Sequence, residues 1–216
     1  MRHALTHEER SQLEHHVETA EARTGTQIVL SVIERSDNYA ELPWKSFALG
    51  ASLTGFVFFI INLLWPLKSS VVAAFLAIVM ILAAGAVFAL LCVFVPDFAR
   101  LFLSSRRADE ETHQYAESIF LSRQLFATRE RKAVLLLVSL FERRIVVLPD
   151  SGLKSQLNRE AIDTVIHNMR GYLKAGQTAR ALDTGLVKLE EFLSGKTPPE
   201  LSLNELSNDI IEEKGA

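Results

Sequence analysis

The chain has 216 residues, of which 49% are hydrophobic, and its formal net charge at pH 7 is -3. This charge, together with the lack of a basic stripe with interleaved aromatic residues, excludes a typical nucleic-acid-binding protein. The single cysteine, Cys92, excludes an intramolecular disulfide and a metal site built on cysteine pairs. About 170 residues remain when two long apolar segments are set aside, and that length suits one domain.

The N-terminal part predicts one helix followed by one strand. Thr6 and Glu9 have the spacing of a capping box, and Gly25 can end the helix in a left-handed conformation. Residues 27–33 form a short, nearly continuous apolar run rich in β-branched side chains, which predicts a strand buried on both faces. The polar and acidic N-terminus does not have the pattern of a secretory signal peptide.

Two apolar segments then follow, at residues 47–67 and 71–95, and neither contains a charged side chain. A bilayer core about 30 Å thick requires roughly 20 apolar residues in helical form, and both segments meet that length. They predict a transmembrane helical hairpin; the alternative is a pair of helices buried in a soluble core. Ala51 and Gly55 are four residues apart, a spacing that lets two helices approach closely.

The flanks of this hairpin predict its orientation. Its tip carries only Lys68, whereas its open end is flanked by five cations: Arg35, Lys45, Arg100, Arg106 and Arg107. Cationic flanks remain in the cytoplasm, so we expect both soluble parts of the chain on the cytoplasmic side of the membrane.

The second half predicts a helix, two strands that form an antiparallel hairpin, and two further helices. These elements are expected at residues 108–126, 133–139, 144–148, 159–174 and 178–193. Residues 197–216 are expected to form an acidic, weakly structured tail.

This order of elements predicts the architecture. A long crossover that contains helices usually joins parallel strands, so the first strand should pair in parallel with the second. The expected fold class is α/β: a three-layer α/β/α sandwich on a small mixed sheet, with the transmembrane hairpin inserted. Residues 1–43 and 97–205 would form a split cytoplasmic domain, residues 44–96 the hairpin, and residues 197–216 the tail.

Charged residues are expected to gather at the edge formed by the carboxyl ends of the first two strands, where ligands of parallel α/β sheets bind. Two turns supply them: Glu34, Arg35 and Asp37, and Glu142, Arg143 and Arg144. Such an edge can bind a metal or a phosphate group; the alternative is an ordinary solvated turn. The chain enters the predicted membrane segment directly after the first strand, so this edge should face the bilayer. Its arginines would then meet anionic head groups, at about 1 kcal/mol per cation.

Asp150 is the metal-ligand candidate at the opposite edge, and Asp37 is the other acidic candidate. A hard cation needs several oxygen ligands, which one carboxylate does not provide. The sequence contains no nucleophile elbow, Walker loop or dinucleotide fingerprint. These observations favour a membrane-tethered interaction or assembly domain; an enzyme is the alternative.

Three stretches give the chain a family resemblance: residues 5–10 with 24–32, residues 128–139 with 142–145, and residues 204–206. In this order they resemble the TPM domain family, named for thylakoid, photosystem-repair and acetylcholine-receptor-associated members, and in particular its bacterial membrane-hairpin subgroup. The glycine-rich pattern that the family shows after the third strand is reduced here to Gly152.

The resemblance implies two kinds of function. The plant member is described as an acid phosphatase, and some bacterial members bind divalent metal through acidic loop residues. Bacterial hairpin members tend to accompany a LemA-type membrane protein. The resemblance therefore implies a factor for interaction, assembly or maintenance of membrane proteins in the bacterial cytoplasmic membrane. The alternative that it implies is a phosphatase-like hydrolase that uses Ca²⁺ or Mg²⁺.

Overall fold

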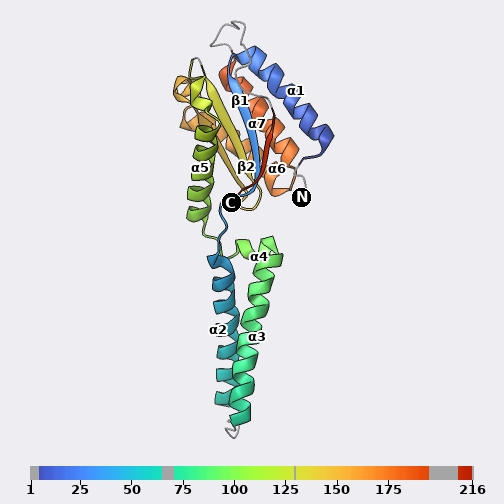
Figure 1. The fold of residues 1–216 in the computed structure, drawn as a ribbon, viewed down its shortest axis with the longest axis vertical. Coiled ribbons are helices and arrows are strands. Elements are labelled where there is room, and N and C mark those ends of the chain that lie inside the picture. The colour runs from blue at the N-terminus through green and yellow to red at the C-terminus, as the bar shows by residue number, and fades with distance from the viewer. Residues whose placement is uncertain (1–4, 65–70, 129, 195–208, 216) are drawn as a thin grey trace. The chain divides into compact units, whose positions relative to one another are not determined.

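A computed structural model describes residues 5–64, 71–128, 130–194 and 209–215. The chain divides into two compact units, Met1–Asp37 with Ala108–Ala216, and Asn38–Arg107 (Figure 1). The first unit is the split α/β unit and the second contains the apolar helices. The expectation that residues 1–43 and 97–205 fold as one independent domain stays a prediction.

The split unit is built on a mixed sheet of four strands in the order β3-β2-β1-β4. The strands are β1 (Gln27–Arg35), β2 (Ala133–Ser139), β3 (Arg144–Pro149) and β4 (Ile211–Gly215). β1 pairs in parallel with β2, with Gln27 opposite Ala133, and β2 pairs antiparallel with β3. The predicted pairing of the first three strands is confirmed.

Helices cover both faces of this sheet. One face packs against α1 (His7–Thr24), α6 (Arg159–Lys174) and α7 (Thr178–Leu193), and the other against α5 (Ser105–Ser122). Each face of the sheet has its own apolar core. Alternate residues of the buried strands contribute to the two cores, because successive side chains point to opposite faces. Leu136 belongs to the core beneath α7 and Leu135 to the core beneath α5. The expected three-layer α/β/α sandwich is confirmed.

The start of the first helix follows its sequence signals. The Thr6 side chain accepts a hydrogen bond from the Glu9 amide, and the Glu9 carboxylate accepts one from the Thr6 amide. The Thr6 amide and the Thr6 hydroxyl both donate hydrogen bonds to the Glu9 carboxylate, which lowers the pKa of Glu9 because these bonds favour the charged form. Gly25 ends the helix at φ 64°, a left-handed conformation that glycine adopts without steric cost.

The expectation of a weakly structured tail is wrong at residues 211–215, which form β4 beside β1. Two features stabilise this strand against its high charge. Ile210, the residue before it, is only 3% exposed and packs in the core beneath α1. Glu212 and Glu213 form ion pairs with arginines from two different helices. The rest of the predicted tail, residues 197–208, lies outside the described residues.

The second unit contains two long antiparallel helices, α2 (Glu41–Leu64) and α3 (Val71–Phe94), followed by the short α4 (Pro96–Arg100). α2 begins six residues before the predicted apolar segment at residue 47, because Glu41 and Pro43 are both tolerated in a first helical turn. Within this unit, Arg107 forms an ion pair with Glu41 and lies over the Tyr39 ring.

The two long helices pack most closely at two glycines. A Cβ atom at Gly50 would lie 2.8 Å from the Phe88 ring, and one at Gly85 would lie 2.7 Å from the Phe47 ring. The predicted contact at Gly55 is looser, because a Cβ atom there would meet its nearest neighbour at 3.8 Å. On α2 the close contact is therefore at Gly50, five residues before Gly55.

Most apolar side chains of α2 and α3 point outward. The most apolar 18-residue window of α2 is 6% buried and that of α3 is 11% buried. Both helices are long and apolar enough to cross a membrane. The alternative of two helices buried in a soluble core does not match this exposure.

Candidate functional site

The structure brings the predicted charged residues together where β1 and β2 end. One of them, Glu142, is buried in the protein interior. Its side chain is only 5% exposed. The carboxylate accepts hydrogen bonds from the Ser36 amide at 2.9 Å, from the Ser36 hydroxyl at 2.8 Å and from the Ser139 hydroxyl. Glu142 therefore ties the end of β1 to the turn between β2 and β3.

Helix α5 joins the same edge. The Thr112 hydroxyl lies 3.4 Å from the Ser36 hydroxyl, and both residues are buried. Arg144 is half-buried and forms an ion pair with Asp109, with 2.5 Å between the Arg144 Nε and the Asp109 Oδ1. Several polar and charged side chains at this edge therefore link β1, the turn and α5 through hydrogen bonds and an ion pair.

The remaining predicted residues lie nearer the surface. The Arg35 guanidinium lies 5.3 Å from the centre of the Phe141 ring. Glu34 and Arg143 are exposed, and Asp37 is half-buried. Arg143 has φ 53°, a left-handed conformation that costs roughly 1–2 kcal/mol for most residues, so the turn presents this arginine at some cost.

Asp150 lies at the other end of the sheet, so it does not share a site with Asp37. Its side chain is buried and forms an ion pair with Arg131, whose Nε lies 3.1 Å and 3.0 Å from the two carboxylate oxygens. It also accepts a hydrogen bond from the Ser151 amide at 2.6 Å. Across the described ranges, the structure contains no group of three His, Cys, Asp or Glu residues placed to hold a metal ion. These two carboxylates are therefore separate, and Asp150 has a clear role in the loop after β3.

Glu21 is a buried carboxylate that the sequence did not single out. β4 pairs with β1 from Ser31 onward, so the earlier residues of β1 have no described strand on that side. The Glu21 carboxylate accepts a hydrogen bond from the Ile28 amide at 2.7 Å, in place of a carbonyl of a neighbouring strand. Burial raises the pKa of Glu21 to about 7, although this hydrogen bond favours the charged form.

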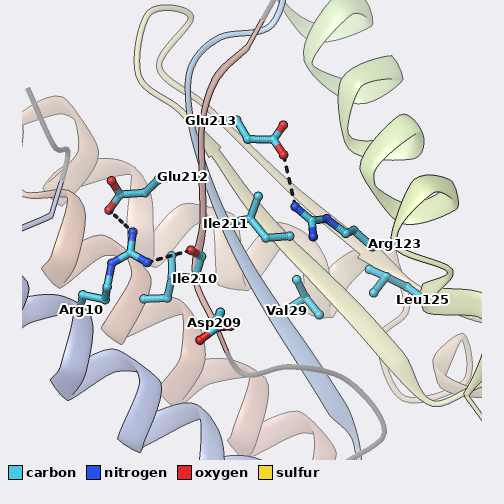
Figure 2. A pocket seen from close by; sticks show the side chains of 9 residues that line it. All are labelled: Arg10, Val29, Arg123, Leu125, Asp209, Ile210, Ile211, Glu212 and Glu213. Atoms are coloured by element: carbon cyan, nitrogen blue, oxygen red, sulfur yellow. Dashed lines mark hydrogen bonds and ion pairs between the residues drawn. The ribbon is translucent and has the colours of Figure 1, made fainter. Parts of the chain in front are cut away.

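A cavity of about 540 Å³ lies beside β4 (Figure 2). Its lining combines apolar and charged side chains: Arg10, Val29, Arg123, Leu125, Asp209, Ile210, Ile211, Glu212 and Glu213. This volume is within the range of small-molecule pockets, about 300–1,000 Å³.

Arg10 of α1 holds β4 from one face of the sheet. Its guanidinium lies 3.0 Å from the Glu212 carboxylate and donates a hydrogen bond to the Ile210 carbonyl at 3.2 Å. This one arginine therefore contacts both the backbone and a side chain of the C-terminal segment (Figure 2).

Side chains of α5 and of the turn after it hold β4 from the other face. The Tyr115 hydroxyl donates a hydrogen bond to the Glu213 carboxylate at 2.8 Å, and Arg123 lies 3.5 Å from the same carboxylate. Burial, and then the contact with Glu213, raise the pKa of Tyr115 to about 12. The sequence pattern did not predict this cluster; the available signal was the pair of adjacent glutamates, which point to opposite faces once they lie in a strand.

Residues 89–192 match the family model described as TPM domain. A search of curated proteins found no match. The fold is similar to the NMR structure of the BA42 protein from the psychrophilic bacterium Bizionia argentinensis, with a TM-score of 0.58 and 14% sequence identity. That similarity covers 98% of this chain and 97% of the BA42 chain, and at this identity it is a similarity of fold.

Proposed function

Residues 89–192 match the TPM domain family model, and from that premise we propose that the chain is a membrane-anchored interaction module for another membrane protein. The hairpin of α2 and α3 would be the anchor, and the charged edge at the ends of β1 and β2 would be the contact surface. A LemA-type membrane protein is the first candidate partner. The bacterial cytoplasmic membrane is the proposed location, with both termini in the cytoplasm.

The observation that carries the anchor is the outward-facing apolar surface of α2 and α3. Large side chains such as Phe56, Phe75 and Phe94 are 62%, 64% and 75% exposed. Soluble monomers rarely expose contiguous apolar patches larger than a few hundred Å², whereas a bilayer would cover these side chains. The helices are also not an N-terminal signal sequence, because the whole of α1 and β1 precedes them.

The proposed orientation is tested with single cysteines at positions 69 and 207, in a Cys92→Ala background. A membrane-impermeant thiol reagent applied to intact cells should label position 69, at the hairpin tip, and spare position 207. Broken cells serve as the control for reactivity at both positions. Labelling of position 207 but not of position 69 in intact cells would reverse the orientation.

The proposed contact surface is the exposed part of the charged edge. Glu142 and Arg144 hold α5 and the turn in place, which leaves Glu34 and Arg143 as the residues most accessible to a partner. Their mixed charges suit a complementary protein surface, since charge complementarity mainly sets specificity and association rate.

The partner is tested by photo-crosslinking in native membranes, with a photoreactive amino acid in place of Arg143. The matched control has the same amino acid in place of Arg170, which is exposed on α6. A protein crosslinked at position 143 but not at 170, and lost on Glu34→Arg, would support the proposal. Crosslinks only to lipid would make anionic head groups the ligand and overturn the protein contact.

A phosphatase assay tests the alternative, that the protein is an enzyme. The full chain in detergent is assayed for phosphatase turnover with Mg²⁺, Ca²⁺ or Mn²⁺. Metal-dependent turnover that is lost in Asp37→Asn and kept in Arg143→Glu would overturn the interaction module and favour the hydrolase.

A further inference from the structure

We propose that the edge of β1, between α1 and α5, is an acceptor groove for an extended acidic segment of a partner protein, and that β4 occupies this groove as an exchangeable internal ligand. This inference concerns the lateral edge of β1, which meets the charged edge at the ends of β1 and β2 only at Arg35. Four features of the C-terminal segment carry it.

The first feature is the way β4 is held. It pairs with β1 between Ser31 and Arg35, and its own five residues are all half-buried or exposed. Its apolar contacts are those of Ile210, buried just before it, and of the half-buried Ile211, which packs against the core beneath α5; backbone hydrogen bonds and ion pairs hold the other residues. Segments with few buried apolar contacts open at low free energy, so this strand can leave while the core stays folded.

The second feature is that both walls of the groove bind acidic side chains. Glu212 meets Arg10 of α1, and Glu213 meets Tyr115 and Arg123 on the α5 side. Two adjacent acidic residues in an extended strand place one carboxylate on each wall, because successive side chains point to opposite faces. The groove thus selects two consecutive acidic residues in extended form, which is the strand-addition mode of peptide recognition.

The third feature is the apolar position before the acidic pair. Ile211 lies beside Val29 and Leu125 in the cavity of about 540 Å³ (Figure 2). This space can take an apolar side chain as large as or larger than that of isoleucine.

The fourth feature is a required glycine two positions after the acidic pair. Gly215 has φ 79°, and a Cβ atom there would lie 1.6 Å from the Arg35 carbonyl oxygen. The partner segment should therefore read apolar, apolar, acidic, acidic, any residue, glycine.

The test uses the full chain in detergent micelles and a fluorescent peptide with the sequence of residues 209–216. In the variant Glu212→Lys/Glu213→Lys the internal strand should leave the groove. Fluorescence anisotropy should then show that the peptide binds this variant at least about tenfold more tightly than the wild type, whose own strand blocks the groove. Adding Arg10→Glu and Arg123→Glu should abolish the binding.

Two control peptides test the recognition itself. A peptide with both glutamates changed to lysine, and one with the glycine changed to alanine, should bind at least about tenfold more weakly. Equal affinity of the peptide for the variant and the wild type, or affinity unchanged by the arginine reversals, would overturn the proposal.

Hydrogen exchange separates release of the strand from unfolding. In the Glu212→Lys/Glu213→Lys variant, amides of β1 on the β4 side should lose protection and regain it when the peptide is added, while β2 stays protected. If β2 also loses protection, Gly215→Ala replaces the charge variant, because it displaces the end of the strand without a change of charge. Failure of the peptide to protect β1 in a variant with intact β2 would refute the exchange. A wild-type dimer that the charge variant abolishes would make a second copy of this chain the occupant and overturn the assignment to a partner protein.

Discussion

Substitution of the buried Glu21 by glutamine tests the account of the open end of β1. The carboxylate accepts the Ile28 amide at 2.7 Å and is only 5% exposed. Glutamine keeps an acceptor oxygen of the same reach and removes the ionisable group. The change therefore isolates the free energy of burying the charge from that of the hydrogen bond.

The magnitude follows from the pKa of Glu21, which folding raises from the ordinary 4.5 to about 7. Between these two pH values the unfolded chain loses the proton and the folded chain keeps it. The free energy of unfolding therefore falls as the pH rises across this window, by roughly 3 kcal/mol in all. Below the window both states are protonated, so the contribution is complete at low pH and lost above pH 7.

The assay is chemical unfolding, followed by circular dichroism between pH 4.5 and 8, of a variant in which residues 38–107 are replaced by a flexible linker. Glu21→Gln should remove most of the decline and exceed the parent at pH 8 by up to about 3 kcal/mol. Glu8→Gln, at an exposed position of the same helix, is the matched control and should keep the decline. An unchanged decline in Glu21→Gln would refute the burial argument.

Three further predictions test other parts of the structure. The linker variant of residues 38–107 should itself be soluble and unfold in one cooperative step, since Asp37 and Ala108 belong to one unit; unfolding in two steps would contradict this. Gly50→Leu should force the hairpin helices apart and raise the rate at which a maleimide labels the buried Cys92 in micelles, whereas Gly55→Ala, with its nearest contact at 3.8 Å, should not. Glu142→Ala leaves buried donors without their acceptor and should lower the free energy of unfolding by roughly 2–4 kcal/mol in urea titrations, and a loss below about 0.5 kcal/mol would contradict its structural role.

Local patterns predicted most of the sandwich. These patterns depend only on residues close together in the chain. They are the capping box at Thr6, the continuous apolar runs of β1 and β2 and the uncharged segments of the hairpin. The helices at 159–174 and 178–193 have the predicted bounds for the same reason. The long crossover then predicted the parallel pairing of β1 with β2.

The parts that the sequence did not predict depend on partners far apart in the chain. β4 looks too acidic for a strand until Arg10, about 200 residues earlier, neutralises Glu212. Glu142 resembles an ordinary turn residue until Ser36, 106 positions away, donates to it. Neither pairing leaves a periodic signal, so the edge could be predicted as charged but not as internally bonded.

The insertion of the hairpin between the two central strands has a consequence for the order of events on the ribosome. Roughly 100 residues separate the end of β1 from the start of β2, which at about 5–20 residues per second takes on the order of 5–20 s to synthesise. During this interval β1, with seven of its nine residues destined for burial, has no strand to pair with. The hairpin emerges within the same interval, so under the proposed anchoring its delivery to the membrane would precede completion of the sheet. The growing chain would then reach the membrane with β1 still unpaired.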